Sequence, residues 1–416
     1  MYLVWCVTHV PDEWHAGRSE HPPLLLLLLL LLCLPTSSLP TSPSLPPSSL
    51  PSDCPTSLQG ISQATTEAMR RRRTMTVVVV LLILLCGEDV RADYSVRLAT
   101  TALYYAKAAY CNAEAISSWT CVSCASNPGL QKVRVFTNAK HSTQAFVGVN
   151  DSMIVVSFRG TRDINNWLHN LDFLFAPYIR DGCVGCLVHA GFHCELESLW
   201  AEMRGYLQEL VAGKGIEGIL ITGHSLGGAM ATIAAANLMS QNPLFPSAPK
   251  VLLYTFGQPR VGNEAFVSWL LASFCRDGHE SYRVTHKRDV VPHVPPMFVG
   301  YLHVPHEVWY DNDEDTVHKN CNDVFGIPCS ALTAKEDPNC SGSIVPTSVE
   351  DHLKYLGVYT GCSCDPGEAI SDEELRLPPE LEWIVAMDYI YQQSRNMSRF
   401  PSSPLFKKSL EARRRK

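Results

Sequence analysis

A serine lies in a pattern that is typical of an acyl-transfer nucleophile. Ser225 stands at the centre of Gly223-His224-Ser225-Leu226-Gly227. The apolar run 218–222 before it predicts a short buried strand, and the Ala-rich segment 227–241 after it predicts a helix. A sharp strand-to-helix turn exposes the serine hydroxyl above a sheet, and the helix N-terminus offers free N–H groups to a developing oxyanion. The pattern therefore predicts that Ser225 is a nucleophile.

A serine hydroxyl is a weak nucleophile unless a base activates it and an acid orients that base. In parallel-sheet enzymes with this turn, the acid and then the histidine follow the serine along the chain. Five aspartates are candidates for the acid: Asp289, Asp311, Asp313, Asp315 and Asp323. Asp289 follows a predicted strand at 282–285, and catalytic groups gather at the carboxyl ends of strands. We therefore favour Asp289.

Five histidines after Ser225 could be the base: His293, His303, His306, His318 and His352. His352 comes last in the chain and opens a short amphipathic segment, so the pattern favours it. His303 and His306 remain alternatives at this point, with a role as core or loop histidines otherwise.

The elements around these residues alternate between strand and helix. Segments 152–158, 218–222, 251–256 and 282–285 have the length and β-rich composition of strands. Between the first two, apolar residues recur at helical spacing over 195–212. This alternation predicts an α/β fold, with a mainly parallel central sheet and helices on both faces.

Composition excludes several classes of protein. The 416 residues carry a net charge of −7, whereas a nucleic-acid-binding protein needs a basic face. Hydrophobic residues make up 46% of the chain, which is too many for a disordered protein. No apolar run in 93–364 reaches the 18 residues or so of a membrane span. We expect one large domain over 93–364.

The N-terminal region resembles a secretory leader. Four arginines, Arg70 to Arg73, precede an apolar run over 77–85, and Val90-Arg91-Ala92 offers small residues for cleavage before Asp93. Residues 69–92 thus predict a signal peptide, and the protein is expected outside the cell or in the secretory lumen. A membrane anchor is the alternative, although the apolar run is about half the length needed.

The two ends of the chain differ from the central domain. Residues 1–68 are of low complexity, and we interpret them as an unfolded leader or an upstream extension of the gene. Residues 365–416 are interrupted by Pro378, Pro379, Pro401 and Pro404 and have a basic end, so we expect a flexible tail with one short helix over 381–392.

Twelve cysteines in 93–364 support an oxidising compartment. Two CxxC pairs, Cys121/Cys124 and Cys183/Cys186, are disulfide candidates. A zinc site is the alternative interpretation of these pairs. No further Cys/His spacing of a compact zinc module accompanies them, so we expect no metal.

Six motifs in a fixed order resemble one family, the class 3 or fungal-type triacylglycerol lipases, over roughly Tyr94 to Cys364. They are Val156-Ser-Phe-Arg-Gly-Thr161, Val188-His-Ala-Gly-Phe192, Gly223-His-Ser-Leu-Gly-Gly-Ala229, Gly257-Gln-Pro-Arg-Val-Gly-Asn263, Arg288-Asp-Val-Val-Pro-His-Val-Pro-Pro296 and Asp351-His-Leu-Lys-Tyr-Leu-Gly357. Six ordered matches are more specific than any one of them.

The resemblance implies a role for each matched residue. It implies an α/β-hydrolase-type fold in which Ser225 is the nucleophile, His352 the general base and Asp289 the residue that orients it. It further implies that the N–H groups of Thr161 and Leu226 form the oxyanion hole, and that no cofactor is needed.

The same resemblance implies a lid and two disulfides. The lid would be the amphipathic segment 163–171, with Trp167 as its apolar anchor; an ordinary surface helix is the alternative. The implied disulfides are Cys183–Cys186 and Cys111–Cys362. Six cysteines have no counterpart in the family: Cys194, Cys275, Cys321, Cys329, Cys340 and Cys364.

From these residues we expect a secreted serine hydrolase that cleaves lipid esters, with acylglycerols first, at a lipid–water interface. We expect no nucleic-acid partner and no obligate protein partner. A phospholipase A1 or a feruloyl-type esterase would use the same machinery. A non-catalytic lipid-binding protein is the alternative from a different class.

Overall fold

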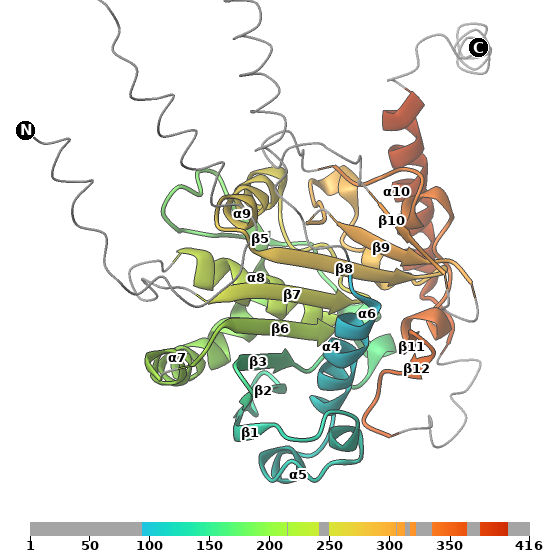
Figure 1. The fold of residues 1–416 in the computed structure, drawn as a ribbon. Coiled ribbons are helices and arrows are strands. Elements are labelled where there is room, and N and C mark those ends of the chain that lie inside the picture. Colours follow the sequence, from blue (N-terminus) through green and yellow to red (C-terminus); the bar gives the residue numbers. More distant parts are fainter. Residues whose placement is uncertain are drawn as a thin grey trace, which may run out of the picture. The chain divides into compact units, whose positions relative to one another are not determined.

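The computed structural model describes residues 94–213, 215–240, 249–304, 306–312, 317–321, 335–363 and 375–397, all within one compact unit (Figure 1). The expected leader at 1–68 and signal peptide at 69–92 lie outside the described residues. The α-helices are α4 (Val96–Ala108), α5 (Ala113–Ser117), α6 (Ile164–Asn170), α7 (Ala190–Ala212), α8 (Leu226–Ser240), α9 (Glu264–Arg276) and α10 (Pro379–Met397). Short 3₁₀ turns are η1 (Val122–Ser126), η3 (Val291–His293), η4 (Met297–Val299), η6 (Ser341–Ser343) and η7 (Glu350–His352).

One large sheet organises the described residues. Its strands lie in the order β1 (Gln131–Asn138), β2 (Thr143–Asn150), β3 (Met153–Phe158), β6 (Gly218–His224), β7 (Lys250–Phe256), β8 (Glu280–His286), β9 (Glu307–Tyr310) and β10 (His318–Asn320). Strands β3 to β9 pair in parallel, and antiparallel pairs form at both edges. Two small hairpins pair β4 (Phe175–Pro177) with β5 (Leu187–His189) and β11 (Lys354–Tyr355) with β12 (Val358–Tyr359). The prediction of an α/β fold with a mainly parallel sheet is confirmed.

Helices cover both faces of the sheet because its central strands are apolar on both sides. In β6, Ile219 and Ile221 pack into one core cluster with α7, α8 and α9, whereas Leu220 packs into a second cluster with α4. Continuous apolar runs of this kind are typical of parallel strands that are buried on both faces. Strands β6, β7 and β8 end on the same side of the sheet, where β11, β12 and α10 also lie (Figure 1).

The local predictions hold with small shifts at the ends. The strand expected at 218–222 runs on to His224, and the helix expected at 227–241 is α8. The predicted apolar stripe of α7 is buried. However, α7 begins at Ala190 and not near Glu195, because the His189 side chain accepts a hydrogen bond from Phe192 N and caps the helix earlier.

The tail prediction was wrong over residues 375–397. This part contains α10, and Leu381 and Val385 on it are only 4% and 2% exposed. The helix expected at 381–392 is therefore longer than the sequence suggested. Its prolines do not disrupt it, because Pro379 occupies the first turn, where a missing N–H costs no helical hydrogen bond.

A buried ion pair fastens α10 to the central domain. Arg260, which is 0% exposed, donates through Nη1 to Asp388 at 2.9 Å and forms two hydrogen bonds with Glu336. The other Asp388 oxygen accepts from Met297 N at 2.6 Å. Two carboxylates thus surround one buried guanidinium, and the charge of Arg260 lowers the pKa of Glu336 well below its ordinary value.

The structure contains both disulfides that the resemblance implied. Cys111–Cys362 joins the end of α4 to the segment after β12, and Cys183–Cys186 closes a loop. Cys121–Cys124 is also a disulfide, so neither CxxC pair offers thiolates to zinc. Of the cysteines without a family counterpart, Cys321 pairs with Cys340, Cys275 is disulfide-bonded and Cys194 is an exposed free thiol, while Cys329 and Cys364 lie outside the described residues. No helix among the described residues has both the length and the hydropathy to span a bilayer.

We predict that Asp388→Asn lowers the free energy of unfolding by about 1–3 kcal/mol, because the amide has one acceptor oxygen where the carboxylate has two, and a buried donor, Arg260 Nη1 or Met297 N, loses its partner. Urea denaturation followed by tryptophan fluorescence measures this. Asp277→Asn, which breaks a surface pair with Arg276, is the matched control and should change the stability by less than about 1 kcal/mol. Equal effects of the two variants would show that the Arg260 cluster does not hold the helix.

Candidate active site

Ser225 occupies a strained turn between β6 and α8. Its φ is 59°, a left-handed conformation that is uncommon for a residue with a side chain. A Cβ at Gly223 would lie 2.3 Å from the Gly227 backbone, and one at Gly227 would lie 2.3 Å from the carbonyl oxygen of Phe158. Only glycine fits at either position, so these two residues make the turn sterically feasible.

The hydroxyl of Ser225 is buried and unpaired. The residue is 1% exposed, and Ser225 Oγ has no hydrogen-bond partner among the described residues. Its backbone is fixed, since Ser225 N donates to Phe256 O at 2.9 Å. A buried polar atom left unpaired is costly and commonly marks a functional site.

His352 and Asp289 form the hydrogen bond expected of a base and its orienter. His352 Nδ1 lies 2.9 Å from Asp289 Oδ2, and both side chains are 1% exposed. A carboxylate can only accept, so Nδ1 carries the proton and Nε2 presents its lone pair. Nε2 is buried and, like Ser225 Oγ, has no partner in the part of the chain that the structure describes.

Two further donors hold the Asp289 carboxylate. Val291 N donates to Oδ1 at 2.9 Å, and the Tyr355 hydroxyl donates to Oδ2. The backbones of Asp289 and Ser348 also form an isolated parallel β-bridge. This bridge aligns the segment after β8 with the segment that leads to His352. The sequence analysis missed Tyr355, although it lies within the motif that contains His352.

Backbone contacts place His352 beside the serine turn. His224 Nε2 lies 2.8 Å from the carbonyl oxygen of His352, and the two rings are 4.5 Å apart. Gly257, with a φ of 55°, has no side chain to fill this space; a Cβ there would lie 2.9 Å from both the His352 ring and the Asp289 carboxylate. The residue next to Ser225 is thus tied directly to the histidine.

His224 belongs to the turn, and both of its ring nitrogens have hydrogen-bond partners. Its Nδ1 lies 2.9 Å from the Tyr110 hydroxyl, and burial lowers the pKa of His224 well below its ordinary value. A neutral His224 donates from Nε2 to the His352 carbonyl and accepts from Tyr110 at Nδ1. Sequence reasoning missed Tyr110, because it precedes the turn by more than a hundred residues.

The loop after β3 lies against the serine turn. A Cβ at Gly160 would lie 3.1 Å from Ser225 Cβ and 2.6 Å from the His224 carbonyl oxygen. Thr161 follows directly. Leu226 is the first residue of α8, so its N–H has no carbonyl acceptor within its own helix. Gly160 of the loop thus lies close to Ser225 of the turn. Thr161 is the next residue on the loop side, and Leu226 is the next residue on the turn side.

The alternative histidines and aspartates lie elsewhere. His303 Nε2 contacts the Pro292 carbonyl oxygen, and His306 Nδ1 contacts the Ser281 carbonyl oxygen. Burial lowers the pKa of His293 to about 3, and His318 packs against Tyr94 and Tyr310. Asp311 is exposed, and Asp313, Asp315 and Asp323 lie outside the described residues.

Helix α6, three residues after Thr161, covers this region with an apolar face. Asp163 caps it by accepting from Asn166 N at 2.9 Å. Leu168 is 4% exposed and packs in a cluster with Val290 and Val291, directly after Asp289. Trp167 packs against this cluster and against the main core, stacked on Phe192. The apolar face is Ile164, Trp167, Leu168 and Leu171.

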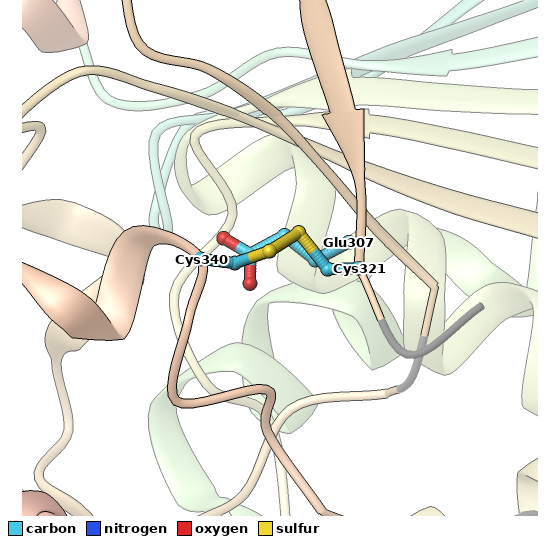
Figure 2. Close-up of side chains that lie close together, drawn as sticks. All are labelled: Glu307, Cys321 and Cys340. Atoms are coloured by element: carbon cyan, nitrogen blue, oxygen red, sulfur yellow. A yellow bond between two sulfur atoms is a disulfide. The ribbon is translucent and has the colours of Figure 1, made fainter. Parts of the chain in front are cut away.

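A second group of potential ligand atoms does not form a metal site. Figure 2 shows the Glu307 carboxylate beside Cys321 and Cys340, whose sulfur atoms are joined as a disulfide. A disulfide has no thiolate to donate. Glu307 is instead held by the Thr285 hydroxyl at 2.6 Å and by Arg283 at 3.4 Å.

Known proteins share this arrangement of fold and motifs. Residues 155–299 match the family described as Lipase (class 3). A lipase from Rhizomucor miehei is 34% identical over 249 residues, which are 59% of this chain and 64% of that lipase, so the chain spans less than two thirds of this relative's length. The secreted mono- and diacylglycerol lipase 1 of Fusarium solani is 33% identical over 66% of this chain and 80% of its own length.

A solved structure agrees with these relatives. It is a triacylglycerol lipase whose catalytic centre is described as a serine-protease triad, and it superposes with a TM-score of 0.57 at 30% identity, over 65% of this chain and 98% of that one. The expected α/β-hydrolase-type fold is thereby confirmed, since the fungal lipases share this sheet and its helices. The identity and coverage show that this chain belongs to the class 3 lipase family.

Proposed function

We propose that this protein is a secreted serine hydrolase that cleaves carboxylic esters of lipids, with acylglycerols as its substrates. One observation carries the proposal: Ser225 stands at a left-handed turn with an unpaired buried hydroxyl, beside a His352 whose Nδ1 is 2.9 Å from Asp289. A scaffold without catalysis would not need to keep Ser225 Oγ and His352 Nε2 both buried and unpaired.

The reaction follows from this geometry. His352 Nε2 accepts the proton of Ser225 while Oγ bonds to the ester carbonyl carbon, and the carbonyl oxygen becomes an oxyanion. The N–H groups of Thr161 and Leu226 stabilise this charge. The bond to the alcohol then breaks, and His352 returns the proton to the leaving alcohol. Water repeats these steps on the acyl-enzyme and releases the fatty acid.

The surroundings of the site favour a lipid acyl chain. Leu168 of α6 packs in one apolar cluster with Val290 and Val291, the two residues that follow Asp289, so an acyl chain that displaces α6 meets these side chains. Burying an acyl chain against such side chains is favourable by about 0.8 kcal/mol per CH₂ group. The names of the relatives, a lipase and a mono- and diacylglycerol lipase, support the same substrate class.

We predict that Ser225→Ala abolishes ester hydrolysis and that Asp289→Asn lowers kcat by about 10⁴-fold, because the amide sets the wrong His352 tautomer. His352→Ala should be as damaging as Ser225→Ala. Rates on p-nitrophenyl butyrate and labelling of Ser225 by a fluorophosphonate probe measure these effects. His303→Ala and His306→Ala are the controls. A normal kcat in His352→Ala together with a loss of kcat in either control would show that the general base is His303 or His306 and not His352.

We also propose that α6 is a lid that opens at a lipid surface. Opening exposes Trp167 and Leu168 at a cost of roughly 1.5–3 kcal/mol per large side chain in water, and contact with lipid removes that cost. Trp167→Ala should therefore lower activity on emulsified triacylglycerol more than on a soluble short-chain ester. Rates measured across the solubility limit of the substrate test this; a smooth hyperbola and equal losses on both substrates would leave a plain esterase.

The disulfides and the apolar run before Asp93 support export of the protein. N-terminal sequencing of the natural protein should give a mature chain that begins near Asp93. Alkylation without reductant should modify Cys194 and spare Cys111, Cys362, Cys321 and Cys340. A chain that begins before Met69 with mostly alkylatable thiols would contradict export.

A further inference from the structure

Helix α10 is apolar on two opposite faces. Leu381, Val385 and Asp388 point into the protein and are 4%, 2% and 1% exposed. Trp383, Met387 and Ile390 lie on the other face and are 63%, 39% and 57% exposed. Their spacing of four and three residues aligns these three side chains in one stripe along the helix. An ordinary surface helix would present polar residues at these positions.

A neighbouring turn extends this stripe. Phe298 and Val299 of η4 are each 40% exposed, and Phe298 contacts the Tyr391 ring of α10 with centroids 6.4 Å apart. Asp388 accepts from Met297 N of the same turn, so η4 and α10 are rigidly joined. We call the five exposed side chains, Trp383, Met387, Ile390, Phe298 and Val299, the outer patch.

The inner face of the same helix belongs to the apolar cluster that includes the proposed lid. Leu381 and Val385 pack in one cluster with Leu168 of α6 and with Val290, next to Asp289. One helix therefore shares an apolar cluster with the proposed lid on one side and carries the outer patch on the other. A surface that binds the patch is thereby brought close to the lid.

The charges and size of the outer patch identify its partner. Glu380 and Glu382 are exposed beside the stripe, which disfavours an anionic membrane. Five partly exposed side chains offer on the order of 500 Å², given about 150–250 Å² for a whole aromatic side chain. A stable protein interface needs about 800 Å² per partner. A neutral lipid surface needs neither a basic patch nor an area of this size, because it accepts apolar side chains without shape or charge matching.

We propose that the outer patch docks the protein onto a neutral lipid surface and so brings that surface close to the lid helix α6. The inference rests on the proposed function for the nature of the lipid, but the docking itself needs no catalysis. It assigns a role to a helix outside the stretch 155–299 that matches the family.

Flotation of the full-length chain with triolein droplets coated with phosphatidylcholine tests the proposal, in a Ser225→Ala background that prevents hydrolysis. Trp383→Ser with Ile390→Ser should weaken partitioning at least tenfold, and added salt should not change this difference. In the active chain, the same double change should slow hydrolysis of emulsified triolein and leave kcat/KM on p-nitrophenyl butyrate unchanged.

Ile179→Ser is the matched control. Ile179 is 80% exposed, and its neighbour Tyr178 donates to Asn237, about 18 Å along α8 from Ser225. The Ile179→Ser variant should float like the parent protein. Equal flotation of the Trp383→Ser/Ile390→Ser double variant and the parent would overturn the proposal. A dimeric parent protein that becomes a monomer in this double variant would also overturn it. Patch-dependent flotation of a chain that cleaves no ester would instead overturn the proposed function and leave the docking intact.

Discussion

The turn at Ser225 is the constraint on which the other features of the site depend. A non-glycine residue in the left-handed region costs on the order of 1–3 kcal/mol, and the surrounding packing must offset it. Here β6 is buried along its whole length, and α8 packs against β6 and β7. Gly223, Gly227 and Gly160 let three backbone segments approach closely around the serine. The packing at the centre of the sheet thus maintains the strained backbone of Ser225, because the buried strands and helix there leave little room to relax.

The proposed base, His352, and its proposed acid, Asp289, depend on the same centre through longer connections. The link from His224 to the carbonyl of His352 ties the base to the turn, and the bridge between Asp289 and Ser348 aligns the two segments that carry acid and base. Tyr355 and Val291 N complete the hydrogen bonding of the carboxylate. Each of these contacts removes freedom from one triad member without occupying Ser225 Oγ or His352 Nε2, which stay available to a substrate.

Helix α10 is held to the central domain by a charge cluster and by apolar packing. Its Asp388 is the second carboxylate beside the buried Arg260, in addition to Glu336. Its apolar inner face closes the cluster that contains Leu168 and Val290. The proposed lid α6 thus shares one apolar cluster with α10 and with the segment after Asp289, and any opening of α6 must disrupt that cluster.

The sequence by itself determined the parts that depend on neighbouring residues. Local spacing and glycine sterics predict the turn around Ser225, the strands at 153–158 and 218–224, and the buried stripe of α7. Local pattern could only favour His352 over His303 and His306, because the distinction lies in a hydrogen bond to a residue 63 positions away. Tyr110, the Arg260–Asp388 pair and the docking of α10 join residues separated by more than a hundred positions. Only the tertiary structure decided these contacts, since no local periodicity encodes which distant charge or hydroxyl a buried group meets.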